Sequence, residues 1–121
     1  MAVAASGGIR RMSSLSTHVL DLSRGMPAAG VALRLFAGET LLHDGVTDAD
    51  GRCPALRELT LAAGRYRLEF DVADYFRGHG VALSEPPFLD VVPIAFGLAD
   101  AAHCHVPLLV SPFGYSTYRG S

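Results

Sequence analysis

Short runs in which every second residue is apolar, separated by turn-forming residues, constrain the fold of this chain more than any other feature. In the clearest run, residues 65–71, Tyr66, Leu68 and Phe70 alternate with charged residues. Residues 31–36 alternate in the same way. Because successive side chains of a β-strand point to opposite faces, these runs predict strands that are buried on one face only.

Glycine, proline and aspartate divide the rest of the chain into similar short segments. We predict further strands over residues 16–21, 40–43, 88–96 and 103–110, and a short helix over residues 72–77 that ends at the following glycines. Residues 56–61 are ambiguous and could form a short strand. Pro93 interrupts one predicted strand and indicates an edge position or a bulge, and Pro107 indicates an edge position for another.

Together these segments predict an all-β fold, a two-sheet antiparallel sandwich of seven or eight strands with one short helix. A chain of 121 residues is long enough for one domain with its own core. The first residues are small and end in Arg10 and Arg11. We therefore expect a disordered tail over residues 1–13 and a folded domain over residues 14–121.

Composition excludes several classes of protein. The net charge of −2 provides no basic surface for a nucleic-acid partner. No apolar run reaches the roughly 20 residues needed to span a bilayer, so we expect no membrane partner. The chain has no lysine, asparagine or glutamine. Any chemistry must therefore come from His, Arg, Tyr, Ser, Thr, Cys or carboxylate side chains.

The cellular location follows from the same features. The two arginines of the tail follow the small residues instead of preceding an apolar run, so no export signal is expected. Two cysteines do not make a disulfide framework. We expect the cytoplasm, where Cys53 and Cys104 stay reduced, in preference to the periplasm or a peroxisome.

His103 and His105 are the first candidates for a functional site. On a strand they project from the same face, and Cys104 projects into the core. The pair could be one surface and one core histidine, an acid–base pair, or two metal ligands. His18, in the first predicted strand, is either structural or a third member of such a site. Arg52, after the turn at Asp50, is either solvated or a fork of donors for a planar, oxygen-rich ligand.

Several segments resemble the transthyretin-related family, and within it the 5-hydroxyisourate hydrolases. The matching motifs are Ser-Thr-His-Val-Leu-Asp at 16–21, Asp-Gly-Arg at 50–52, Ala-Asp-Tyr-Phe at 73–76, Pro-Phe-Leu at 87–89, His-Cys-His-Val-Pro-Leu-Leu-Val-Ser-Pro at 103–112 and Tyr-Arg-Gly-Ser at 118–121. The terminal tetrad is the most specific motif, because it separates the hydrolases from transthyretin, the thyroid-hormone carrier. Cys104 departs from the family pattern, which mostly has tyrosine there.

This resemblance implies a transthyretin-like (prealbumin-like) sandwich of eight strands with one short helix. It implies a homotetramer whose sites lie at the dimer–dimer interface. The reaction would be hydrolysis of 5-hydroxyisourate, a purine-derived small molecule formed by urate oxidation, to 2-oxo-4-hydroxy-4-carboxy-5-ureidoimidazoline. No metal and no organic cofactor is implied.

The resemblance also assigns roles by position. It implies catalytic roles for His18, Arg52, His105 and Ser121, and substrate binding by His18, Arg52, His103 and Tyr118. In the corresponding hypothesis, one imidazole deprotonates water and the other holds or protonates the opening ring nitrogen. Arg52 would orient the ring and offset the charge that develops on the attacked carbonyl oxygen.

Two other functions stay open. One is a carrier in the style of transthyretin, which would bind hydrophobic small molecules without turnover. His18, Arg52 and His105 would make such a carrier's channel polar, and ring-opening activity separates the two functions. The other is a zinc hydrolase that uses His18, His103 and His105, which a chelator distinguishes from a metal-free enzyme.

Overall fold

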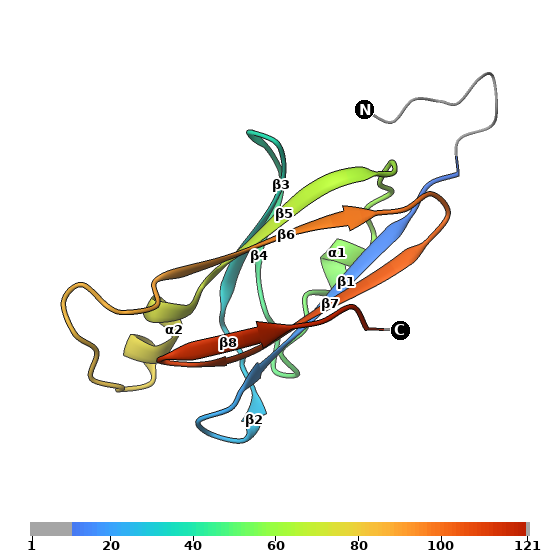
Figure 1. Cartoon of the computed structure of the whole chain (residues 1–121). Coiled ribbons are helices and arrows are strands. Elements are labelled where there is room, and N and C mark those ends of the chain that lie inside the picture. Colours follow the sequence, from blue (N-terminus) through green and yellow to red (C-terminus); the bar gives the residue numbers. More distant parts are fainter. Residues whose placement is uncertain (1–10, 121) are drawn as a thin grey trace.

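The computed structural model describes residues 11–120 and places eight strands of this part of the chain in two packed sheets (Figure 1). The strands are β1 (Ser14–Asp21), β2 (Met26–Pro27), β3 (Ala32–Ala37), β4 (Thr40–Val46), β5 (Gly64–Asp71), β6 (Val91–Leu98), β7 (His103–Ser111) and β8 (Gly114–Thr117). Helix α1 (Pro54–Arg57) and helix α2 (Val72–Gly78) connect strands. The predicted all-β sandwich is confirmed.

One sheet has the strand order β2-β1-β7-β8 and the other has the order β4-β3-β5-β6. Neighbouring strands run antiparallel except β1 and β7, which pair in parallel over their full common length. The prediction of a purely antiparallel sandwich is therefore wrong for this one pair. The cause is the long connection: β1 and β7 are separated by the whole second sheet, so no hairpin fixes their relative direction.

The core lies between the two sheets and is formed by the predicted alternation. Leu15 and Val19 of β1, Leu68 and Phe70 of β5 and Leu108 of β7 are fully buried. Their neighbours in sequence face outward. In the first sheet this leaves the even-numbered residues of β1 and the odd-numbered residues of β7 on one outer face.

Three predictions about individual segments need correction. Residues 56–61, for which a short strand was possible, instead contain part of the four-residue helix α1, so the domain has two short helices. The strand predicted from residue 88 begins only at Val91. Ser13, assigned to the tail, is buried and exchanges two backbone hydrogen bonds with Leu61, so the folded part begins before residue 14. Arg11 and Met12 of that tail are also described, and the Arg11 carbonyl accepts a hydrogen bond from the Ala101 N–H at 3.3 Å. Residues 1–10 lie outside the described residues.

The two prolines behave differently. Pro93 lies on β6, an edge strand, as predicted. Pro107 lies on β7 in the middle of its sheet, which contradicts the prediction. Pro107 has no N–H to donate, and this is tolerated because the pairing of β7 with β8 ends one residue before Pro107 is reached. The last β7–β8 pair is Leu108 with Thr117, and the carbonyl of Pro107 accepts a bond from Thr117 Oγ1 at 2.6 Å.

Helix α2 is tied to the end of β1 by a buried carboxylate. Tyr75 donates its hydroxyl to Asp21 Oδ2 at 2.7 Å, and Ser23 donates to Asp21 Oδ1 from its hydroxyl at 2.6 Å. Burial alone would raise the pKa of Asp21, but these donors and two backbone N–H groups lower it overall. Asp21 is therefore charged at neutral pH and holds the far end of the strand that carries His18.

Within residues 11–120, no helix has the length and apolar character that crossing a bilayer requires. Cys53 and Cys104 are buried free thiols.

Candidate functional site

The site is built on the outer face of the β1–β7 pair. The parallel register places Ser14 opposite His103, Ser16 opposite His105 and His18 opposite Pro107. His103 and His105 are partly buried on this face, and Cys104 is buried on the other. The prediction that the two imidazoles share one face is confirmed.

Arg52 reaches this face through a tight turn. The Val19 N–H donates to the carbonyl of Gly51 at 2.7 Å, and His18 and Arg52 form an antiparallel bridge. Gly51 has a φ of +75°, and a Cβ there would collide with the carbonyl oxygen of Val19. Glycine is therefore required for this turn to lie against β1, which brings Arg52 beside His18.

The turn itself is held by Asp48. Its Oδ1 accepts the backbone N–H groups of Asp50 at 2.9 Å and of Arg52 at 3.0 Å. Asp48 thus fixes the backbone of Arg52 and leaves the guanidinium group free of this carboxylate. Among residues 11–120, the Arg52 side chain forms no ion pair, and its positive charge lies close enough to act on His105.

The C-terminal segment closes the other side of His105. The Gly120 N–H donates to the carbonyl of His105 at 2.8 Å. A Cβ at Gly120 would lie 2.6 Å from Cδ2 of the His105 ring, closer than side chains approach. Glycine in the terminal tetrad therefore lets the backbone pack directly against the imidazole. Sequence reasoning gave no role to Gly120, although its place in the most specific motif was the available signal.

Two residues of the predicted set are not shown to join the histidines. Tyr118 is exposed and lines, with Phe96 and Val106, a hollow of about 310 Å³ that contains no histidine. Ser121 lies outside the described residues, so its predicted role stays a prediction. The structure brings together His18, Arg52, His103 and His105.

The electrostatic environment keeps His105 neutral. Burial lowers its pKa below the ordinary histidine value, and the nearby positive charge of Arg52 lowers it further. His18, His103 and Arg57 act in the same direction. At neutral pH the imidazole therefore has a free lone pair, which a general base requires.

Two serines of β1, which sequence reasoning missed, hold the histidine rings. Ser16 Oγ lies 2.7 Å from Nδ1 of His105 and 3.0 Å from Nε2 of His103. Ser14 Oγ lies 2.6 Å from Nδ1 of His103. Both ring nitrogens of His103 are therefore engaged by hydroxyl groups, whereas only Nδ1 of His105 is engaged within the described chain. No sequence signal could identify these serines, because their partners are almost 90 residues away.

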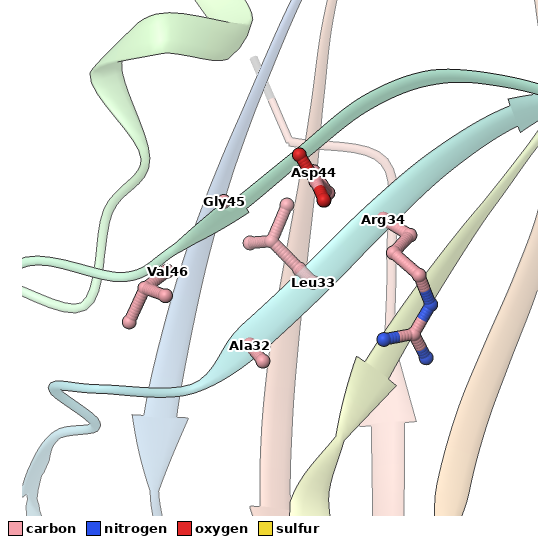
Figure 2. A pocket seen from close by; sticks show the side chains of 6 residues that line it. All are labelled: Ala32, Leu33, Arg34, Asp44, Gly45 and Val46. Carbon is pink, nitrogen blue, oxygen red and sulfur yellow. The ribbon is translucent and has the colours of Figure 1, made fainter.

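Other possible sites contain no comparable chemistry. In residues 11–120, no group of three or more His, Cys, Asp or Glu side chains is arranged to hold a metal ion. Burial raises the pKa of the Cys53 thiol, as expected for a core residue. A hollow of about 320 Å³ lies on the β3–β4 hairpin (Figure 2). Arg34, which lines this hollow, donates a hydrogen bond from Nη2 to Oδ1 of Asp71 at 2.7 Å. Its guanidinium group is therefore not free to bind a ligand.

Comparison with known proteins agrees with this geometry. The model of the HIUase/Transthyretin family matches residues 15–120. The chain is 54% identical over 113 residues to a 5-hydroxyisourate hydrolase of Mesorhizobium japonicum, covering 88% of this chain and 91% of that protein. It superposes on the structure of Klebsiella pneumoniae 5-hydroxyisourate hydrolase with a TM-score of 0.80 and 38% identity, covering 93% and 97% of the two chains.

The carrier branch of the family is also similar. Transthyretin from Sparus aurata superposes with a TM-score of 0.75 and 34% identity, covering 88% of this chain and 95% of that chain. The family model spans nearly all of the described residues, and the relatives match over almost their full length. The chain belongs to the HIUase/Transthyretin family.

Proposed function

We propose that this chain hydrolyses 5-hydroxyisourate in urate degradation, giving 2-oxo-4-hydroxy-4-carboxy-5-ureidoimidazoline. The observation that carries the proposal is the convergence of Arg52 and two histidines, His18 and His105, on one face of the β1–β7 pair. A channel for hydrophobic ligands has no need of these polar groups. The hydrolase relatives, which are about half identical in sequence, support the same substrate.

In the proposed mechanism, neutral His105 takes a proton from a water molecule at its free Nε2. The resulting hydroxide adds to a ring carbonyl of the substrate, and the adjacent ring C–N bond then breaks. This gives the carboxyl and ureido groups of the product, with a proton returned to the departing nitrogen. His18, on the neighbouring strand, holds that nitrogen and supplies the proton. The proton that His105 took from water then passes through solvent to His18, which restores both imidazoles.

Arg52 has two roles in this mechanism. Its planar guanidinium donates paired hydrogen bonds to the oxygen atoms of the substrate and so fixes the ring for attack. Its charge also stabilises the negative charge that develops on the attacked oxygen. Tyr118 and Ser121 complete the site as substrate-binding and catalytic groups in the assembled protein. No metal ion or organic cofactor takes part.

We also propose that the protein is a homotetramer whose sites lie at the dimer–dimer interface. Four strands have an unpaired edge in the described chain, β2 and β8 in one sheet and β4 and β6 in the other. Phe113 and Tyr115, at the start of the β8 edge, are large and exposed. Unpaired edges with exposed aromatic residues are typical of surfaces that are covered by a partner. An interface over the β1–β7 face would enclose the site and separate it from bulk solvent.

The first prediction concerns activity itself. Purified protein is expected to accelerate the decay of freshly prepared 5-hydroxyisourate, followed by ultraviolet absorbance, and the acceleration is expected to survive a chelator. His105→Ala should reduce kcat by roughly 10²-fold or more, because it removes the general base. His79→Ala, which removes an imidazole outside the site, should keep wild-type activity.

Each alternative outcome has a distinct meaning. Decay no faster than the spontaneous rate contradicts the hydrolase and favours a carrier, which ligand titration would then test. Loss of activity with chelator, restored by zinc, contradicts the metal-free mechanism.

The second prediction concerns pH. Because burial and Arg52 lower the pKa of His105, its neutral form persists below the ordinary value of 6.5. We expect kcat/KM to be level near neutral pH and to fall on acidification, with a midpoint below that value. Arg57→Ala removes one of the positive charges near His105, so the midpoint should move upward. Arg65→Ala, on the other sheet, should leave it unchanged. A profile that stays level down to about pH 4 contradicts a histidine base.

The third prediction concerns the contact of Gly120 with the His105 ring. Gly120→Ala forces the ring or the terminal segment to move, and we expect kcat to fall about 10- to 100-fold. The thermal midpoint should change little, because Gly120 lies near the end of the chain. Gly78→Ala is the control, since a Cβ there meets open space. Full activity of Gly120→Ala would show that the packing against His105 has no role in catalysis.

The fourth prediction concerns assembly. Size-exclusion chromatography with light scattering is expected to give four times the mass of the single chain. Charged substitution of an exposed aromatic residue on the proposed interface, Phe113→Glu, should reduce this mass while the isolated chain stays folded by circular dichroism. A wild-type mass equal to one chain would contradict the tetramer.

A further inference from the structure

We propose that Ser16 and His103 form a proton relay behind His105 that ends at the hydroxyl of Ser14. This inference deepens the proposed function and rests on His105 as the general base. It gives His103 a positioning and proton-accepting role in place of substrate binding. It also gives roles to two serines for which the sequence provides no functional signal.

The geometry of the relay is a continuous row of short contacts between β1 and β7. The row runs from His105 Nδ1 to Ser16 Oγ at 2.7 Å, then to His103 Nε2 at 3.0 Å. It ends between His103 Nδ1 and Ser14 Oγ at 2.6 Å. Ser16 is almost fully buried, so water does not readily compete for these contacts.

Counting hydrogens shows that the row has a direction. Ser16 has one hydroxyl hydrogen, so it donates to one imidazole and accepts from the other. A neutral histidine likewise has one N–H and one lone pair. If Ser16 donates to His103 Nε2, then His105 must donate from Nδ1 and His103 must donate from Nδ1 to Ser14. This arrangement leaves the lone pair of His105 at Nε2, where the base needs it.

The same row can carry a proton during the reaction. When His105 Nε2 takes a proton from water, its Nδ1 proton passes to Ser16 Oγ. The hydroxyl hydrogen of Ser16 then passes to His103 Nε2. His105 returns to a neutral form and His103 becomes an imidazolium that donates from Nδ1 to Ser14. No proton is gained or lost in this transfer. Reversal of the row returns the positive charge to His105, and the starting state is restored when Nε2 of His105 gives up the proton that it took from water.

The charges around His105 provide the reason for this transfer. Arg52, His18 and Arg57 face His105 from outside its own strand, and all disfavour a positive charge there. Arg52 pairs with His18 of β1. His105 lies opposite Ser16, two residues from His18, and His103 lies opposite Ser14, four residues from His18. His103 lies two residues from His105 along β7, so the transfer moves the positive charge roughly 7 Å along the strand, away from Arg52. Because Coulomb repulsion falls with distance, a positive charge at His103 is repelled less by Arg52 than one at His105.

The relay is tested first without substrate. The ring nitrogens of His103 and His105 are followed by ¹⁵N NMR as pH is lowered. In the wild type we expect His105 to have its proton on Nδ1 and the two rings to titrate as a coupled pair. In Ser16→Ala we expect the Nδ1 preference of His105 to be lost and the rings to titrate independently. Unchanged tautomers and coupling in Ser16→Ala would overturn the relay, whatever the activity.

Activity is the second test. Ser16→Ala is expected to lower kcat at least tenfold with little change in KM, a part of the roughly 10²- to 10⁴-fold that acid–base catalysis supplies. Ser16→Thr retains the hydroxyl and should recover much of this loss. His103→Gln keeps hydrogen bonding but cannot accept the proton as a cation, so it should lower kcat as Ser16→Ala does. Ser111→Ala, at the far end of β7, is the matched control.

The outcomes separate the relay from the proposed function. Wild-type kcat in both Ser16→Ala and His103→Gln would overturn the role of the relay in an active enzyme. A wild-type chain that does not open the substrate ring contradicts the proposed function, and the ¹⁵N titration alone then decides whether the relay exists.

Discussion

The parallel pairing of β1 with β7 is the contact on which the rest of the site depends. The two strands lie side by side in Figure 1. Their register aligns Ser14, Ser16 and His18 of β1 with His103, His105 and Pro107 of β7. A shift of this pairing by one residue would turn each group to the opposite face, into the core. The buried leucines and valines on the inner face of both strands oppose such a shift. The hydrophobic core therefore sets the register of the polar face.

Two glycines then bring further backbone segments to this face. Gly51 allows the turn that carries Arg52 to touch β1, and Gly120 allows the terminal segment to touch His105. In both places a side chain would occupy the space of a neighbouring group. The site is thus assembled from a strand pair and two close backbone approaches, and its positive charges gather around an imidazole that burial already keeps neutral.

Sequence reasoning identified what periodicity and local chemistry encode. Alternation predicted β5, the common face of His103 and His105, and the burial of Cys104, because these depend only on neighbouring residues. It could not predict the parallel β1–β7 pair, and so it missed Ser14 and Ser16, whose partners lie at the other end of the chain. Pro107 was placed on an edge because the early end of β8 cannot be read from β7 itself. The grouping of His18, Arg52 and His105 came from the family resemblance, since spacing alone left metal binding and structural roles open.

The wide separation of β1 and β7 in the chain has a consequence for biosynthesis. His18 leaves the ribosome well before His105 and Gly120 have been made. The nascent chain therefore holds an incomplete sheet until β7 has been made, and until then the edge of β1 that pairs with β7 is unpaired.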